Sequence, residues 1–192
     1  MIESRKIILA SQSHRRIELL NLLGLKNIEI KNHKVDEENF KWEKPYSKSI
    51  LDLSELKARS VQNKKNKNSI IIAGDTVVIR AGKFFNKTNS TSEIKSYLKT
   101  LSGRKHFVYG GLCVLSPSGK SFRKFSKTEV YFNKINDHEI TKQVLEDGIG
   151  KAGGYALQNY GSRFVKKIRG CYTNVIGISI PELYKILKNP EV

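Results

Sequence analysis

The chain has 192 residues, of which 39% are hydrophobic and 9% aromatic, so it can bury a core as one domain or two small lobes. Its apolar runs are too short for a membrane span or a signal peptide, and two cysteines exclude a disulfide framework, so we expect a cytoplasmic protein without a membrane partner. The formal net charge is +17, mostly from lysine. Without a nucleic-acid-binding motif, this charge predicts a solvated lysine surface and no specific nucleic-acid partner.

The first predicted elements are a buried strand at Ile7–Ala10, a leucine-rich helix ending at Gly24 and a second strand at Asn27–Asn32. Residues 47–62 predict another helix, with one apolar stripe and Leu56 close to it. Lys57 falls on this stripe, where a buried ammonium needs a partner. Its side chain therefore either snorkels to the surface or reaches into a cleft.

The junction between the first strand and the first helix has the composition of an anion site. Ser11 and Ser13 can cap the helix start and offer donors to an anion. Arg15 and Arg16 add two cations at the end where the helix dipole is already positive. An arriving anion would relieve this arrangement. The alternative is a capped helix with solvated arginines.

A predicted strand over Ile70–Ile79 is apolar except for one acid, Asp75, which follows Gly74. An Asp beside a Gly is commonly a turn residue, but the flanking apolar residues argue against a turn here. A carboxylate inside such a strand must be paired, hydrogen-bonded, protonated or bound to a metal. Asp75 is thus a candidate functional residue.

The second half of the chain predicts a helix over 90–100 and a long hairpin over Lys105–Phe132. A helix over Asp137–Glu146 leads into a glycine-rich stretch from 148 to 170. Such glycines allow a backbone to approach a ligand closely, although glycine loops alone are a weak signal. A closing helix is predicted over 181–188.

Several spaced motifs resemble the Maf family of nucleoside triphosphate pyrophosphatases, over nearly the whole chain. They are Leu9–Leu20, Val35–Glu37, Lys57–Ala58, Gly74–Val78, Leu101–Val108 and Lys151–Gln158. The sequence departs from the family pattern at His14 and Thr88, where proline is usual, and at Cys171 and Ile178–Ser179. None of these departures removes a carboxylate or a cation that the chemistry needs.

The resemblance implies an α/β fold in a single domain over residues 1–192. Its mixed, elongated sheet and flanking helices would form two lobes around a central cleft. It also implies hydrolysis of a nucleoside triphosphate to the monophosphate and pyrophosphate, with Mg²⁺ or Mn²⁺ as cofactor. Some members of the family were first described as inhibitors of septum formation. The oligomeric state is left open, with a homodimer as one option.

The resemblance also implies roles for individual residues. Asp75 would be the proton acceptor for the attacking water and, with Glu37, would hold the divalent metal. Lys57 and Lys87 would neutralise charge that develops on the phosphates. His106, at the start of a strand, is interpreted as structural. The implied substrate-binding residues are Ser11, Ser13, Arg15, Arg16, Lys57, Thr76, Lys87 and Gln158.

Substrate choice within the family is tied to the positions of Arg15, Thr76 and Gln158. This combination resembles the branch that acts on dTTP and UTP, and a glutamine amide can match the edge of thymine or uracil. Two alternatives remain open at this point. One is a pyrophosphatase directed at the purine nucleotides ITP and XTP, and the other is a non-catalytic regulator of septum formation.

Overall fold

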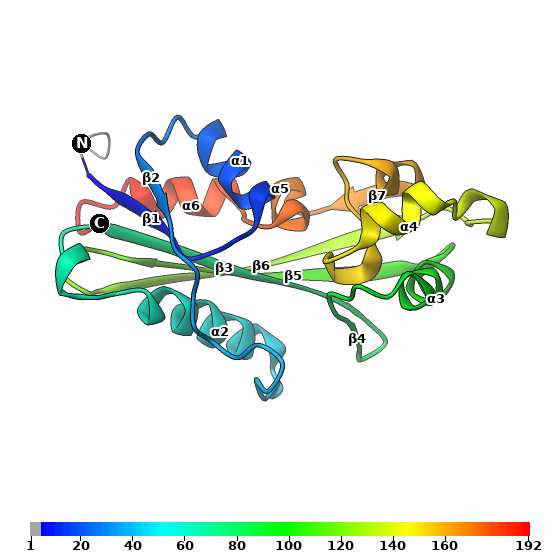
Figure 1. The fold of residues 1–192 in the computed structure, drawn as a ribbon, viewed down its shortest axis with the longest axis horizontal. Coiled ribbons are helices and arrows are strands. Elements are labelled where there is room, and N and C mark those ends of the chain that lie inside the picture. The colour runs from blue at the N-terminus through cyan, green and yellow to red at the C-terminus, as the bar shows by residue number, and fades with distance from the viewer. Residues whose placement is uncertain (1–4) are drawn as a thin grey trace. The chain divides into compact units, whose positions relative to one another are not determined.

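A computed structural model describes residues 5–192 of the chain and contains, within that range, one seven-stranded sheet in the order β2-β1-β3-β5-β6-β7, with β4 paired to β3 (Figure 1). The strands are β1 (Ile7–Leu9), β2 (Ile28–Ile30), β3 (Ile70–Arg80), β4 (Lys83–Phe85), β5 (Lys105–Leu115), β6 (Ser121–Phe132) and β7 (Val165–Arg169). The α-helices are α1 (His14–Leu22), α2 (Tyr46–Ser60), α3 (Thr91–Leu101), α4 (Lys142–Gly148), α5 (Tyr172–Ile176) and α6 (Ile180–Leu187).

The sheet is mixed, because β1 pairs in parallel with β2 and β3 whereas β4 and β7 pair antiparallel with their neighbours. This confirms the predicted mixed α/β fold. The chain forms two compact units. Unit 1 is the chain up to Asp75 with Gly110–Ser126 and Gly177–Val192, and unit 2 is Thr76–Tyr109 with Lys127–Ile176. The single domain and the central cleft stay predictions.

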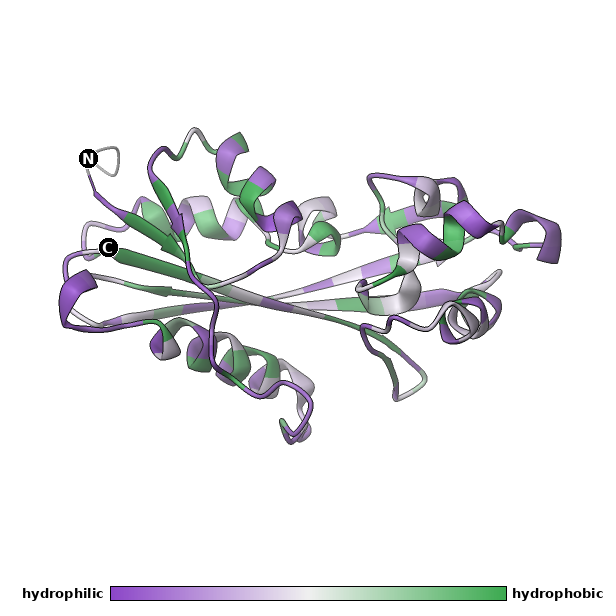
Figure 2. Ribbon diagram, viewed as in Figure 1, coloured by the Kyte–Doolittle hydropathy of each residue, from purple (hydrophilic) through white to green (hydrophobic). Residues whose placement is uncertain are grey.

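Unit 1 is built on the three parallel strands, of which β1 and the first half of β3 are hydrophobic (Figure 2). Helices α1 and α6 lie on one side of these strands and α2 lies on the other (Figure 1). Helix α2 packs closely because Gly111 of β5 has no side chain. A Cβ there would stand 2.4 Å from the carbonyl oxygen of Ile50 and 2.5 Å from Oγ of Ser54. This close approach fixes the inner face of α2 against the sheet.

Unit 2 encloses a core in which aromatic side chains meet edge to face. Phe85 and Tyr97 have ring centroids 5.1 Å apart, and Phe132 and Tyr155 have centroids 4.9 Å apart. Apolar side chains of α3 and α4, such as Ile94, complete this core. The left-handed Gly154 (φ 71°) lies against Ile94, where a Cβ would stand 3.0 Å from Cγ2. The glycine-rich stretch therefore packs tightly on α3 in this part of unit 2.

His106 belongs to this core, as its structural interpretation requires. Its side chain is fully buried, its Nε2 lies 2.8 Å from the Tyr155 hydroxyl, and its ring meets that of Phe132 at 4.8 Å. Burial lowers the pKa of His106 to about 3. The imidazole is therefore neutral in the folded protein at neutral pH.

Acid is expected to destabilise the fold through His106. The His106 imidazole binds a proton below pH 6.5 in the unfolded chain, but only below about pH 3 in the folded chain. The free energy of unfolding should therefore fall as pH falls through this window, by up to about 1.4 kcal/mol per pH unit from this group. Urea titrations at several pH values measure this slope. A His106→Phe variant lacks this titrating group, so its free energy of unfolding should depend less steeply on pH over this range. An identical slope in the variant and the parent would contradict this role of His106.

Most predicted elements are confirmed, including the hairpin and the closing helix, but two expectations are wrong. The helix predicted over Asp137–Glu146 is broken into a 3₁₀ turn at Asp137–Glu139 and α4, because the Thr141 hydroxyl caps α4 by accepting from the Val144 N–H at 3.4 Å. Leu56, expected close to the buried stripe of α2, is 48% exposed. In the described residues no helix has the length and apolarity to cross a membrane. Both cysteines are free thiols.

Candidate active site

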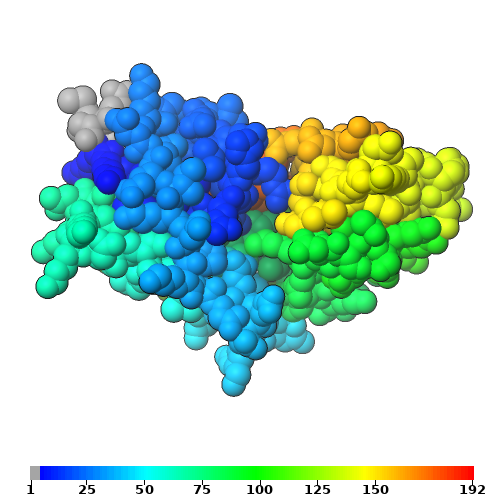
Figure 3. All heavy atoms as spheres, viewed as in Figure 1, coloured from blue at the N-terminus to red at the C-terminus, as the bar shows by residue number. Residues whose placement is uncertain are grey.

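The candidate site lies in unit 1, at the carboxyl edge of the three parallel strands. Strands β1 and β2 end at this edge, whereas β3 continues past it. Because Leu9 pairs with Ile30 and with Ile72, the residues that follow them emerge together. Ligands of open α/β sheets bind outside this carboxyl edge. Ser11 and α1 follow β1, a long loop follows β2, and Asp75 follows Ile72 within β3. The loop from 31 to 45, light blue, crosses the surface of unit 1 toward α2 (Figures 1 and 3).

The centre of the site is one buried ammonium group held by two carboxylates. Nζ of Lys57 lies 2.5 Å from Oδ1 of Asp75 and 2.9 Å from Oε1 of Glu37. Lys57 is 1% exposed and Asp75 is 3% exposed, whereas the side chain of Glu37 is 33% exposed. Lys57 therefore reaches inward from α2 and does not snorkel to the surface. Glu37 forms the side of this cluster that solvent and ligands can reach.

Local hydrogen bonds hold the loop that carries Glu37. The Asp36 carboxylate accepts from the backbone N–H groups of Glu38 and Asn39, which closes a tight turn around Glu37. Further back, the N–H of Lys34 donates to the Ser60 hydroxyl at the end of α2. The loop is thus tied to the same helix that supplies Lys57.

His33 touches the outer carboxylate of the cluster. Its Nε2 lies 3.1 Å from Oε1 of Glu37, and its side chain is 18% exposed. Its other ring nitrogen, Nδ1, is buried with no hydrogen-bond partner in the described chain. His33 therefore restrains the orientation of Glu37. His33 cannot be predicted as a site residue from the sequence, because nothing in a non-helical loop indicates a contact between residues 33 and 37.

Arg16 makes two hydrogen bonds that link the segment before α1 to Gly177. Its Nη1 donates to the Ser11 hydroxyl at 3.0 Å, and its Nε donates to the Gly177 carbonyl at 3.1 Å. Ser11 Oγ also accepts from the N–H of Ser13, the N-cap residue of α1, whose own hydroxyl makes no capping bond. The Ser-x-Ser segment is therefore held in a fixed shape. Gly177 is a second residue of the site that the sequence does not predict.

The charges in this region balance one another. Burial lowers the pKa of Arg16, and the negative charges of Asp75 and Glu37 only partly offset this shift. An arginine guanidinium still keeps its proton at neutral pH. Arg16 and Lys57 are thus two buried cations that interact electrostatically with the same two carboxylates. Because Lys57 already has two carboxylate partners, the cluster can accept a polyanion only together with added positive charge.

The donor set fits a hard divalent cation. Mg²⁺ is commonly bound by one or two protein carboxylates, with substrate oxygens and waters completing its shell. Glu37 and Asp75 supply two carboxylates that converge on a single point, now the Lys57 ammonium. Within residues 5–192 no group of three histidine, cysteine or acidic side chains could form a complete protein cage. The remaining ligands would have to come from substrate and water.

The structure brings part of the predicted site together within unit 1. Arg15 is half-buried on α1 in unit 1. Thr76 is half-buried in β3, whereas Lys87 and Gln158 are exposed in loops, and all three belong to unit 2. Their predicted contacts with substrate stay predictions. Contacts within unit 1 join Ser11 to Ser13 and Arg16, and join Lys57 to Glu37 and Asp75.

Comparisons with known proteins identify the family. A family model described as Maf-like protein matches residues 6–190. A dTTP/UTP pyrophosphatase of Clostridium perfringens (strain SM101) is 37% identical over 189 residues, which cover 97% of this chain and 98% of the relative. A protein of the same name from Thermoanaerobacter sp. (strain X514) is 40% identical over 185 residues, 95% of each chain.

A solved structure also aligns with this chain. It is the nucleoside-triphosphatase / dITP/XTP pyrophosphatase of Mycobacterium abscessus, with a TM-score of 0.41 and 15% identity over 68% of this chain and 74% of that one. The sequence matches, in contrast, extend over almost the full length of the chain. The chain therefore belongs to the Maf family.

Proposed function

We propose that this chain hydrolyses nucleoside triphosphates to the monophosphate and pyrophosphate. The observation that carries the proposal is the Lys57 ammonium shared by Glu37 and Asp75 at the edge of three parallel strands. The relatives named dTTP/UTP pyrophosphatase support it, since they match this chain over nearly its whole length. A set of two carboxylates and two buried cations suits a reaction in which water is activated beside a polyphosphate.

In the proposed mechanism Asp75 is the proton acceptor. Water attacks the α-phosphorus, its proton passes to the Asp75 carboxylate, and the bond to the oxygen that bridges the α- and β-phosphates breaks. Pyrophosphate leaves with that electron pair. Lys57, 2.5 Å from Asp75, holds the carboxylate in one orientation and offsets negative charge near the reacting phosphate. Arg16 and Ser11 give the start of α1 a fixed shape for phosphate binding.

Glu37 and Asp75 would hold the divalent cation. When bound, Mg²⁺ or Mn²⁺ polarises phosphoryl oxygens and supplies the positive charge that a polyanion needs in this site. Because Glu37 is the more exposed carboxylate, it can turn toward an incoming metal–nucleotide complex while Asp75 keeps its pairing with Lys57. His33 would limit how far Glu37 turns.

We further propose that pyrimidine triphosphates are the better substrates and that Gln158 reads the base. If its amide bonds the base in a desolvated pocket, losing the bond costs about 1–3 kcal/mol. Gln158→Ala should therefore lower kcat/KM for dTTP and UTP by roughly 5- to 150-fold, and should lower it much less for triphosphates that make no contact with this amide. Steady-state kinetics give kcat/KM for dTTP and for GTP, and the ratio of these two values is compared between the variant and the parent.

The ratio separates base reading from a structural role. If Gln158 only braced the glycine-rich loop, all triphosphates would suffer alike and the dTTP-to-GTP ratio would not change. A Gln62→Ala variant is a matched control, because Gln62 is a half-buried glutamine of unit 1 beside Gly119 in the turn of the β5–β6 hairpin. Its ratio should equal that of the parent.

A substrate screen tests the proposed function as a whole. The purified protein is incubated with each common triphosphate and with ITP and XTP, with and without Mg²⁺, and pyrophosphate is detected. We expect metal-dependent release, fastest from dTTP and UTP. A preference for ITP or XTP would select the purine-directed alternative, and no release from any triphosphate would overturn the proposal.

A further inference from the structure

The sheet of unit 2 has an outer face on which aromatic and cationic side chains alternate. In the unit 2 parts of β5 (105–109) and β6 (127–132), every second residue is buried in the core, including His106, Val108, Thr128 and Val130. The residues between them point the other way and remain partly or fully exposed. We call this surface the aromatic face, formed by Lys105, Phe107, Tyr109, Lys127, Tyr131 and Arg169.

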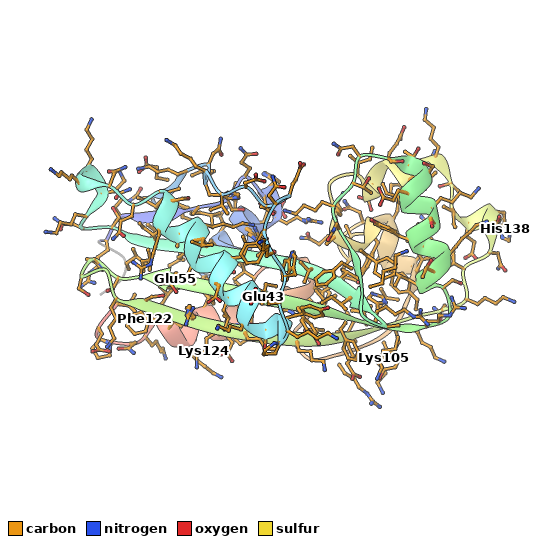
Figure 4. The ribbon with its side chains drawn as sticks, turned by 90° about the horizontal axis from the view of Figure 1, so that it is seen from below. Glu43, Glu55, Lys105, Phe122, Lys124 and His138 are labelled. Atoms are coloured by element: carbon orange, nitrogen blue, oxygen red, sulfur yellow. The ribbon has the colours of Figure 1, made fainter. Side chains whose placement is uncertain are left out.

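Rings and cations on the aromatic face lie within contact distance of one another across strands. Nζ of Lys127 on β6 lies 4.3 Å from the ring centroid of Phe107 and 5.8 Å from that of Tyr109, both on β5. Nζ of Lys105 lies 5.2 Å from the Phe107 centroid and 5.9 Å from the Tyr131 centroid. The face is therefore one continuous surface. Lys105 projects from the side of β5 away from α3 (Figure 4).

The charge of this face is strongly one-sided. Arg169 on β7 lies 5.7 Å from the Tyr131 ring, and Lys167 is paired directly opposite Tyr131, so both belong to the same side of the sheet. The acid on this side, Glu129, accepts from the Tyr131 hydroxyl at 2.6 Å and from Lys105 at 3.4 Å. Its charge is thus already engaged, and the face as a whole is positive.

We propose that the aromatic face binds single-stranded nucleic acid without sequence preference. Unstacked bases present flat π-surfaces that can stack on partly exposed rings, and phosphates can pair with the interleaved lysines and arginine. Every base has such a surface, so no sequence code is expected. A duplex keeps its bases stacked on each other and could use only the charges. A second copy of this chain would bring the same positive charge, which disfavours it as the occupant.

Fluorescence anisotropy with a labelled oligodeoxyadenylate of about 16 nucleotides tests the proposal, since single-strand sites span about 4–16 nucleotides per binding fold. Hydroxyl ends and the absence of a triphosphate keep this probe distinct from the proposed substrate. Phe107→Leu and Tyr131→Leu should each weaken binding roughly 5- to 150-fold, because leucine keeps an apolar body but cannot stack. A log–log salt slope of about −3 is expected if about four phosphates are neutralised.

A matched control is Tyr184→Leu on α6 in unit 1, where Lys188 lies 4.6 Å from an exposed tyrosine ring. It should bind the oligonucleotide like the parent, and thermal unfolding of each variant shows that the fold is kept. Four results would overturn the proposal: no binding at low salt, equal affinity for a duplex of the same length, equal weakening by Tyr184→Leu, or self-association that Phe107→Leu abolishes. Each outcome is independent of the pyrophosphatase assay.

Discussion

Asp75→Asn is expected to lower kcat for triphosphate hydrolysis by about 10²–10⁴-fold at saturating metal, the usual contribution of a positioned general base. Asparagine keeps the size of the side chain but cannot accept the proton, and it is a poorer ligand for a hard cation. Lys57 would still have Glu37 at 2.9 Å, so the fold should persist. Steady-state kinetics over a range of Mg²⁺ concentrations measure the effect.

Asp52→Asn is the matched control for this variant. Asp52 lies on α2 in the same unit and forms an exposed ion pair with Arg123, at 2.8 Å. Removing its charge should leave kcat unchanged and alter the stability by about 0.5 kcal/mol or less. Equal turnover by Asp75→Asn and the parent would exclude Asp75 as the proton acceptor. Unfolding of Asp75→Asn, detected by circular dichroism, would show that the cluster has a structural role.

Lys57→Met is expected to destabilise unit 1 by about 3–5 kcal/mol, because breaking a buried ion pair leaves the remaining charge without a partner. Methionine fills the same space, and Asp75, which is 3% exposed, would lose the ammonium 2.5 Å away. The free energy of unfolding in urea measures the loss. Lys48→Met, at an exposed position of the same helix, should change it by no more than about 0.5 kcal/mol.

A double variant distinguishes charge from packing as the cause. Lys57→Met combined with Asp75→Asn leaves no isolated buried charge at this position, so it should cost clearly less than the sum of the two single changes. Additive losses would mean that the ammonium and the carboxylate do not act as a pair.

The sequence predicts the strands and helices of the candidate site well, and it predicts that Lys57 and Asp75 need partners. Apolar residues surround each of them, and a buried charge cannot remain alone. It does not predict that they partner each other, since that depends on how α2 crosses β3. The crossing is fixed by contacts such as the one between Gly111 and Ile50, which lie far apart in the chain.

Two contacts of the site have no local signal at all. Arg16 bonds the carbonyl of Gly177, and backbone carbonyls are the same in every residue, so no side-chain pattern marks this one. His33 meets Glu37 only because the turn at Asp36 folds the loop back. The broken helix near Thr141 is different. A threonine hydroxyl competes with the backbone for an N–H group, and this competition ended the helical pattern that periodicity alone predicted.

We propose that a triphosphate is cleaved between its α- and β-phosphates at the cluster in which Lys57 is paired with Glu37 and Asp75. The most direct measurement is the product balance from dTTP and Mg²⁺, followed by ³¹P nuclear magnetic resonance for the parent, Asp75→Asn and Asp52→Asn. The account predicts dTMP and pyrophosphate in equal amounts from the parent and Asp52→Asn, with almost none from Asp75→Asn. Release of orthophosphate with dTDP, or undiminished pyrophosphate from Asp75→Asn, would contradict it.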